Sequence, residues 1–239
     1  MRNNILTSDA QAQLTPDTVF ANLKAGNSNY TTDNLTAVNI NDLRAASVSG
    51  QAPQAIVLSC IDSRVVVEEV FDQALGDVFV ARVAGNFVNT DIVASMEYAC
   101  KVAGSKLIVV LGHEGCGAVK AACDGVELGN ITSLLSNIQP AVDAVKPNVP
   151  APHNSANTDF VNAAIAENVN HTIGEIKSMS PILAEMEAAG EIAIKGGVYQ
   201  LATGAVAWLL SQEYTKQKAP LGAFFIIANN LPPFSLIIS

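Results

Sequence analysis

Two short segments contain the residues best suited to chemistry. In the first segment Cys60 and Asp62 lie two positions apart, and in the second His113 and Cys116 lie three positions apart. Two thiolates, one imidazole and one carboxylate are a favourable ligand set for zinc. Either pair alone is weak evidence, but the two pairs together predict one metal site.

An apolar run precedes each of these segments. Residues 55–58 come shortly before Cys60, and residues 107–111 come shortly before His113. Both runs are typical of buried strands, and ligands of parallel sheets bind where the carboxyl ends of the strands meet. We therefore expect two parallel strands to bring Cys60, Asp62, His113 and Cys116 together.

The rest of the chain alternates between strand and helix patterns. We expect helices at residues 16–24, 41–47, 94–103, 117–123, 130–145, 159–177 and 182–189, and strands at 54–59, 77–83, 106–111, 191–200 and 205–210. Gly26 and Gly104 are the expected stops of the first and third helices. This order predicts an α/β fold, with a mainly parallel central sheet of about four parallel strands plus an antiparallel edge strand, covered by helices.

The chain contains no internal repeat and no low-complexity linker. We expect a single domain over residues 1–239, with an N-terminal helical arm at about 1–50 and an apolar C-terminal tail at about 211–239. The tail is interrupted by Asn229-Asn230 and Pro232-Pro233, so it is too short to span a membrane as a helix. A strand is expected within it at residues 224–228.

Composition narrows the class of function. Of the 239 residues 49% are hydrophobic and 15% are charged, and the net charge of −9 leaves no basic excess for nucleic acid or anionic lipid. The N-terminus has no apolar segment typical of a signal peptide, so we expect a soluble protein without membrane attachment, cytoplasmic, or periplasmic if a signal peptide was removed.

Four cysteines allow two disulfides as an alternative to a metal site. A chain of this length does not need disulfides for stability, and Cys60 and Cys116 each lie beside another ligand-type residue. Cys100 and Cys123 fall in helix-like segments and are expected to be core residues. A bridge between these two remains open.

Several segments together resemble the β-class carbonic anhydrases. The matching segments are residues 60–65 (CIDSRV), 76–86 (GDVFVARVAGN) and 112–118 (GHEGCGA), with 23–27 (LKAGN), 196–199 (GGVY) and 203–204 (TG). They follow the order and spacing of that family, and the resemblance covers roughly residues 16–210. The family often has Asn at the position of Val83, and a small polar pair at the positions of Glu114 and Gly115. These two departures leave the ligand positions unchanged.

The resemblance implies a zinc enzyme for the reversible hydration of carbon dioxide to bicarbonate and a proton through a zinc-bound hydroxide. Its one zinc ion per subunit is held by Cys60, His113 and Cys116, with Asp62 as a fourth ligand in one state. Arg64 is expected to pair with Asp62 and draw it off the metal, which opens the site. Because Asp62 and hydroxide compete for one position, higher pH should favour the open form.

The resemblance also implies a substrate pocket and an oligomer. The pocket residues map by position onto Gln51, Phe79, Ala84, Gly85 and Tyr98, and in the family the residue at Gln51 reaches across from a partner subunit. Core packing explains Phe79 and Tyr98 equally well, and a solvated loop explains Gln51. The expected assembly is a homodimer or a dimer-based tetramer, and no regulatory bicarbonate site is expected.

Three other functions are open at this level. The same scaffold could hydrolyse carbon disulfide or carbonyl sulfide, since the same nucleophile could attack those carbons. A non-catalytic zinc-binding interaction domain is a second alternative, although Arg64 has no purpose in a permanently closed site. A cysteine-nucleophile enzyme using Cys116 and His113 is the third, although no oriented acid is evident and Cys60 would then be unexplained.

Overall fold

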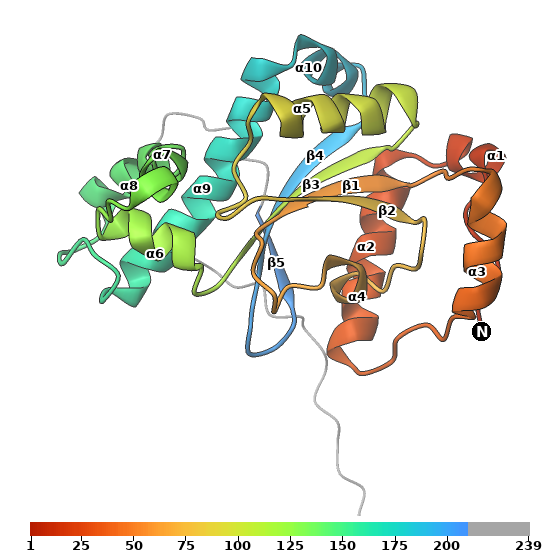
Figure 1. The fold of residues 1–239 in the computed structure, drawn as a ribbon, viewed down its shortest axis with the longest axis horizontal. Helices are drawn as coiled ribbons and strands as arrows, with labels where there is room; N and C mark the ends of the chain where they lie inside the picture. Colours follow the sequence, from red (N-terminus) through yellow and green to blue (C-terminus); the bar gives the residue numbers. More distant parts are fainter. Residues whose placement is uncertain (210–239) are drawn as a thin grey trace, which may run out of the picture.

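A five-stranded sheet forms the centre of the molecule (Figure 1), whose computed structural model describes residues 1–209. The strands are β1 (Ala55–Ser59), β2 (Val78–Arg82), β3 (Leu107–His113), β4 (Ala193–Tyr199) and β5 (Val206–Leu209), in the order β2-β1-β3-β4-β5. The first four strands are parallel, and β5 is antiparallel to β4. The predicted fold class is confirmed. The strand expected at residues 224–228 lies outside the described residues.

Strands β1 and β3 are neighbours in the sheet, and every residue of both is buried. Ser59 at the end of β1 pairs with Leu111 of β3. Cys60, which follows Ser59, therefore lies at the same edge of the sheet as His113, the last residue of β3. The expected meeting of the two ligand segments is confirmed at the level of the backbone.

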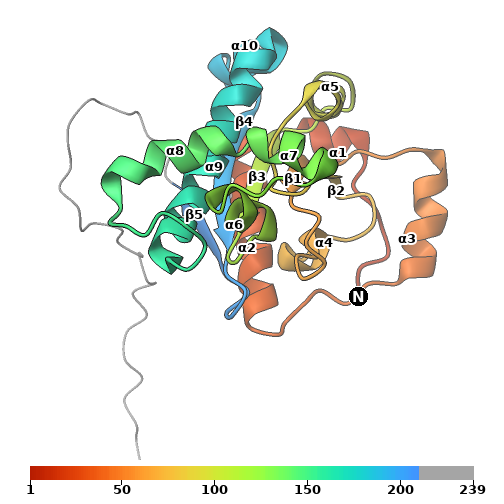
Figure 2. The ribbon, with the colours of Figure 1, turned by 60° about the vertical axis from the view of Figure 1, so that its left-hand side comes forward.

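Helices cover both faces of the sheet (Figures 1 and 2). They are α1 (Ser8–Ala12), α2 (Pro16–Thr31), α3 (Ile40–Ala46), α4 (Val67–Val70), α5 (Thr90–Glu97), α6 (Gly117–Cys123), α7 (Gly129–Ser136), α8 (Gln139–Val145), α9 (Thr158–Met179) and α10 (Pro181–Ala188). Helices α2 and α4 pack on one face, and α5, α9 and α10 pack on the other. A further apolar cluster joins α6, α8 and α9 and includes both Cys60 and Cys116. In the described part of the chain, no helix has the length and apolar character needed to cross a membrane.

Helix boundaries differ by more than two residues from the prediction in three regions. Helix α2 continues through Gly26 to Thr31, so Gly26 is not the expected stop. A glycine is present there because the helix lies against the backbone of Phe71, where a side chain would not fit. The single helix expected at residues 130–145 is two helices, α7 and α8, and Pro140 lies in the first turn of α8. Proline favours a helix start because it has no N–H to donate to the preceding turn.

The helix expected at residues 94–103 begins earlier, at Thr90, and changes character before its end. Asn89 caps its start through a side-chain contact with the Ile92 N–H. The last turn, Tyr98–Val102, is a π-helix, and Gly104 follows with a left-handed φ of +81°. The predicted glycine stop is therefore confirmed, as are the five strands expected within the described residues and the helix at residues 117–123.

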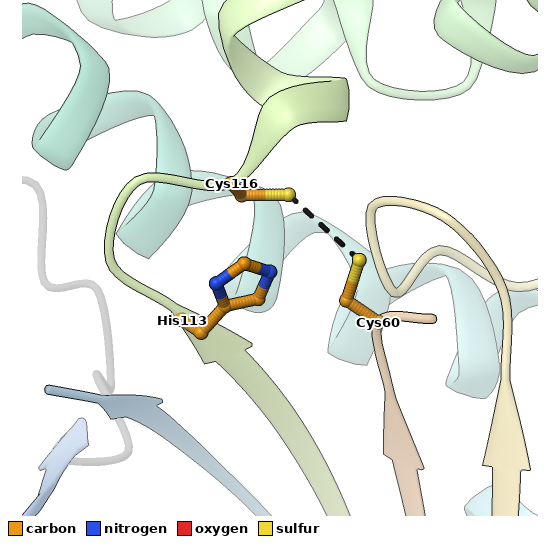
Figure 3. A group of neighbouring side chains, drawn as sticks. All are labelled: Cys60, His113 and Cys116. Atoms are coloured by element: carbon orange, nitrogen blue, oxygen red, sulfur yellow. Dashed lines mark hydrogen bonds between the residues drawn. The ribbon is translucent and has the colours of Figure 1, made fainter. Parts of the chain in front are cut away.

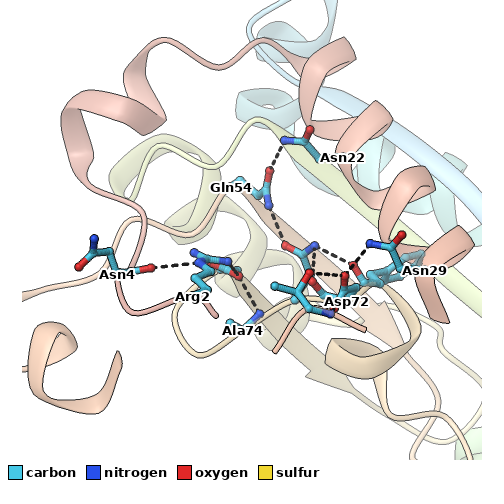
Figure 4. Close-up of polar contacts among 11 residues, drawn as sticks. Arg2, Asn4, Asn22, Asn29, Gln54, Asp72 and Ala74 are labelled. Atoms are coloured by element: carbon cyan, nitrogen blue, oxygen red, sulfur yellow. Dashed lines mark hydrogen bonds and ion pairs between the residues drawn. The ribbon is translucent and has the colours of Figure 1, made fainter. Parts of the chain in front are cut away.

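The N-terminal arm is fastened to the body by polar side chains (Figure 4). Arg2 forms an ion pair with Asp77, whose side chain is only 2% exposed. Asn22 of α2 donates to Gln54 beside β1 (3.1 Å), and Asn29 donates to Asp72 (2.8 Å). The Asn22 contact ties the first half of α2 to the amino end of β1, and the Asn29 contact ties its last turns to the segment after α4.

Candidate metal centre

Cys60, His113 and Cys116 form a buried group at the carboxyl edge of the sheet (Figure 3). Cys60 follows β1, His113 ends β3, and Cys116 stands immediately before α6. Their ligand atoms all lie within 4.8 Å of one another, and the two sulfurs are 4.0 Å apart. Two sulfurs bound to one tetrahedral zinc at about 2.3 Å would lie about 3.8 Å apart. The spacing of the two thiols therefore fits such an ion.

The orientation of His113 also fits a metal ligand. Its Nδ1 lies 2.9 Å from the carbonyl oxygen of Glu114, which can only accept, so Nδ1 carries the proton and Nε2 carries the lone pair. Nε2 is buried and has no hydrogen-bond partner. An unpaired polar atom in the interior is costly, and a metal ion between the imidazole and the two sulfurs would satisfy it.

The three side chains influence one another's protonation. The hydrogen bond with Cys116 lowers the pKa of Cys60, and the same contact together with burial raises the pKa of Cys116. Burial disfavours the charged form of His113, but the Cys60 sulfur, the Glu114 carbonyl and the Asp62 carboxylate together raise the pKa of the imidazole overall. The thiolate form of Cys60 is thus favoured next to the His113 ring. A divalent cation bound between them would stabilise the same negative charge on sulfur.

Asp62 lies beside this group and is held by Arg64. The guanidinium makes two hydrogen bonds to the carboxylate, at 2.9 and 2.7 Å, and the Arg64 N–H adds a third at 3.0 Å. These contacts keep the pKa of Asp62 well below its usual range. The carboxylate oxygen Oδ2 is also 3.7 Å from His113 Nε2.

Neighbouring residues hold the two ligand loops in place. Arg82, at the end of β2, donates to the carbonyl oxygens of Cys60 (2.9 Å) and Val65. The Glu114 carboxylate accepts the Leu201 N–H (3.1 Å), which ties the second loop to the turn after β4. The sequence prediction missed both roles. The signals for Arg82 were its charge at a strand end and its place in the matching segment 76–86.

The predicted pocket residues separate into two groups. Gly85 lies against the site and donates its N–H to Cys60 Sγ at 3.3 Å, and Ala84 precedes it. Phe79 and Tyr98 instead line an apolar groove of about 520 Å³ beside β2, and none of the three candidate ligands lines that groove. Gln51 is exposed. The structure of one chain therefore brings only part of the predicted pocket to the candidate ligands.

The other two cysteines are unpaired. Cys100 packs in the cluster on the α5, α9 and α10 face. Cys123, the last residue of α6, belongs to the cluster that α6 forms with α8 and α9. Burial raises the pKa of Cys100 to about 12 and that of Cys123 to about 11. They are core residues, as predicted, and no disulfide joins them.

Comparison with known proteins gives one consistent answer. The family model described as "Carbonic anhydrase" matches residues 55–206. A carbonic anhydrase of Mycolicibacterium smegmatis is 40% identical over 163 residues, which cover 68% of this chain and 78% of that protein. Carbonic anhydrase 2 of Mycobacterium tuberculosis is 37% identical, with coverage of 68% and 77%. The solved structure of the Coccomyxa β-carbonic anhydrase, in complex with acetazolamide, is 27% identical and superposes with a TM-score of 0.61, covering 81% of this chain and 82% of that one.

The matched region includes the four parallel strands and both ligand loops, and it ends at the first residue of β5. Its buried Cys-His-Cys group is of the kind typical of β-class zinc sites. The chain therefore belongs to the β-class carbonic anhydrases, the enzymes that hydrate carbon dioxide to bicarbonate.

Proposed function

We propose that Cys60, His113 and Cys116 hold one zinc ion per subunit and that Asp62 and Arg64 control access to its fourth position. The observation that carries this proposal is the buried Nε2 of His113, which has no partner and faces two sulfurs 4.0 Å apart. Two thiolates neutralise the charge of a divalent ion, and the neutral imidazole completes a three-ligand base. When bound, zinc supplies a Lewis acid that makes water nucleophilic near neutral pH.

The residues of the chain prepare this site in separate ways. The carbonyl oxygen of Glu114 holds the His113 ring so that Nε2 faces the sulfurs. Arg64 holds the Asp62 carboxylate in a bidentate pair, which leaves the fourth position to solvent. Released from Arg64, the same carboxylate could reach the ligand atoms and close the site, since Oδ2 is already 3.7 Å from Nε2.

We also propose that a second copy of the chain completes the substrate pocket. Phe79 and Tyr98 line the groove beside β2, and the exposed Gln51 contacts none of the candidate ligands in one chain. Strand β2 is an edge strand with apolar side chains, a feature that favours pairing with another copy. A homodimer, or a tetramer built from it, would cover the groove and bring Gln51 to the partner's site. One solved relative, from Sordaria macrospora, is described as tetrameric.

Metal analysis and stopped-flow hydration of carbon dioxide on the same sample test the zinc proposal. Cys60→Ser should lose most of the zinc and most of the activity, because one thiolate ligand is replaced by a weaker hydroxyl. Cys123→Ser is the matched control: Cys123 is buried and unpaired, lies outside the site, and should leave zinc content unchanged. A Cys60→Ser protein with full zinc and full turnover would end the ligand assignment.

A further inference from the structure

A tight turn after β2 brings a backbone N–H to one of the candidate ligands. Gly85 and Asn86 both adopt left-handed φ angles, of +82° and +44°. The Gly85 N–H donates to Cys60 Sγ at 3.3 Å. Glycine is required here by space as well as by φ, because an added Cβ would lie 2.4 Å from Ile138 Cδ1. The direction of this N–H therefore depends on how the Gly85 turn is held.

Helix α9 holds that turn through a buried amide. Asn168 is 1% exposed, and its Nδ2 donates to the carbonyl oxygen of Gly85 at 2.8 Å. One helical turn later, Thr172 Oγ1 contacts the carbonyl oxygen of Asn86 at 3.4 Å. The helix can approach this closely because β3 and β4 present Gly112 and Gly196 to it.

The hydrogen bonding of Asn168 is one-sided. Its Oδ1 has no partner, and the nearby Nδ2 of Asn86 also has none. A buried amide that is only half satisfied contributes little to stability, since the unpaired oxygen has lost its water. The Asn168 side chain does fix the position of the Gly85 carbonyl. The N–H of Gly85 points at the Cys60 sulfur.

We propose that Asn168 is a positioning residue for the zinc thiolate of Cys60. By holding the Gly85 carbonyl it keeps the Gly85 N–H on Cys60 Sγ, and this hydrogen bond stabilises the negative charge of the sulfur. Hydrogen bonds from outside the ligand set tune metal affinity, and their loss typically weakens binding 10- to 100-fold. The inference rests on the proposed function in one respect, namely that Cys60 binds the metal.

A matched pair of variants separates this role from general stabilisation. Asn168→Leu removes the amide at nearly constant volume. Asn27→Leu does the same to a second buried asparagine, which bonds the backbones of Val70, Gly204 and Val206 and touches neither ligand loop. Asn27→Leu should lower the free energy of unfolding more than Asn168→Leu does, because all of its hydrogen bonds are lost from a fully bonded amide, but only Asn168→Leu should affect the metal centre.

Two readouts are needed on the intact proteins. Competition with a chelator should give a zinc Kd at least tenfold higher for Asn168→Leu than for the wild type, and within about twofold of it for Asn27→Leu. In cobalt-substituted protein, the sulfur-to-cobalt charge-transfer band should move to longer wavelength in Asn168→Leu alone, because a thiolate without its hydrogen bond gives up an electron more easily.

The outcomes are distinguishable. If Asn168→Leu and Asn27→Leu show the same Kd and the same cobalt band, the positioning role is overturned while the zinc site stands. If the wild type binds neither zinc nor cobalt, the zinc site fails and the inference with it. Should Asn168→Leu not fold, cadmium-substituted wild type decides: a scalar coupling between the Gly85 amide proton and ¹¹³Cd supports the proposal, and its absence overturns it.

Discussion

At the scale of single residues, the contact between Arg64 and Asp62 is central to the proposed mechanism. The carboxylate has two competing positions: the guanidinium, to which it is bonded at 2.7 and 2.9 Å, and the ligand atoms, which it approaches to 3.7 Å. A bidentate arginine contact is directional, and lysine would not reproduce it. In the proposed mechanism, the occupant of the fourth metal position would therefore depend on one side chain that does not itself bind the metal.

Arg64→Ala should keep zinc and lose most of its turnover, because Asp62 is then free to close the site. Zinc content and the hydration rate, measured on one preparation, check this. Arg44→Ala, on the exposed α3, is the control and should match the wild type in both. Unchanged turnover in Arg64→Ala would remove the gating argument.

Cys100 predicts how stability depends on alkaline pH. Burial raises the pKa of this thiol from 9.0 to about 12. Between these values the unfolded chain releases the proton and the folded chain keeps it, so the free energy of unfolding falls as pH rises. The fall is about 1.4 kcal/mol per pH unit once the pH is well above 9.

Cys100→Ala should therefore show a stability curve that falls less steeply between pH 9.5 and 11, by about that slope. Denaturant unfolding of both proteins across this range measures the difference. The smaller side chain of alanine also adds a loss of stability that is the same at every pH and does not change the slope. Parallel curves for the two proteins would show that Cys100 does not titrate as its burial implies.

At the scale of elements, close approaches of backbone position the helices on the sheet. Gly26 of α2 meets the Phe71 carbonyl, and Gly196 of β4 meets Val169 of α9. At each position a side chain would push the helix away from its neighbour. The location of the ligand loops follows from these approaches, because α9 also holds the turn beside Cys60.

Gly26→Ala should destabilise the protein although alanine is the better helix former. An added Cβ would lie 1.8 Å from the Phe71 carbonyl oxygen, and such overpacking costs about 1–3 kcal/mol or more. Gly174→Ala in α9 is the control, since nothing lies within 4 Å of its added Cβ, and it should stabilise by about 0.5–1 kcal/mol. Thermal unfolding should move the two variants in opposite directions, and a stabilised Gly26→Ala would contradict the packing described here.

At the scale of the whole molecule, the described part of the chain exposes an apolar groove at one edge of the sheet. Strand β2 has β1 on one side only, and Tyr98 beside it remains 54% exposed. Exposed apolar surface next to an edge strand is characteristic of an interface. The proposed dimer would cover the groove and complete the substrate pocket in one step.

Ser95→Arg should convert the proposed dimer to a monomer. Ser95 lines the groove and is exposed, so arginine there costs a single chain little but places a charge where the partner would pack. Light scattering coupled to size exclusion should show the lower mass. The monomer should retain zinc and lose activity, because Gln51 no longer reaches a partner's site. Ser28→Arg on α2 is the control, and an unchanged mass for Ser95→Arg would refute this interface.

The amino-acid sequence alone was enough to predict the sheet, the order of its strands along the chain, and the residue types of the candidate metal site. These features are local: apolar runs mark buried strands, and polar residues just after them mark the edge where strands end. The same local information placed the helix at residues 117–123 correctly.

The contacts that support the candidate ligands could be identified only in the folded chain. Asn168 reaches Gly85 across 83 positions of sequence, and Leu201 reaches Glu114 across 87. Gly26 was mistaken for a helix stop because its neighbour, Phe71, is distant in the chain. Such contacts depend on how helices and strands pack, and neither periodicity nor residue spacing contains that information. For the same reason, one chain leaves Phe79 and Tyr98 apart from the cysteines that the sequence associated with them.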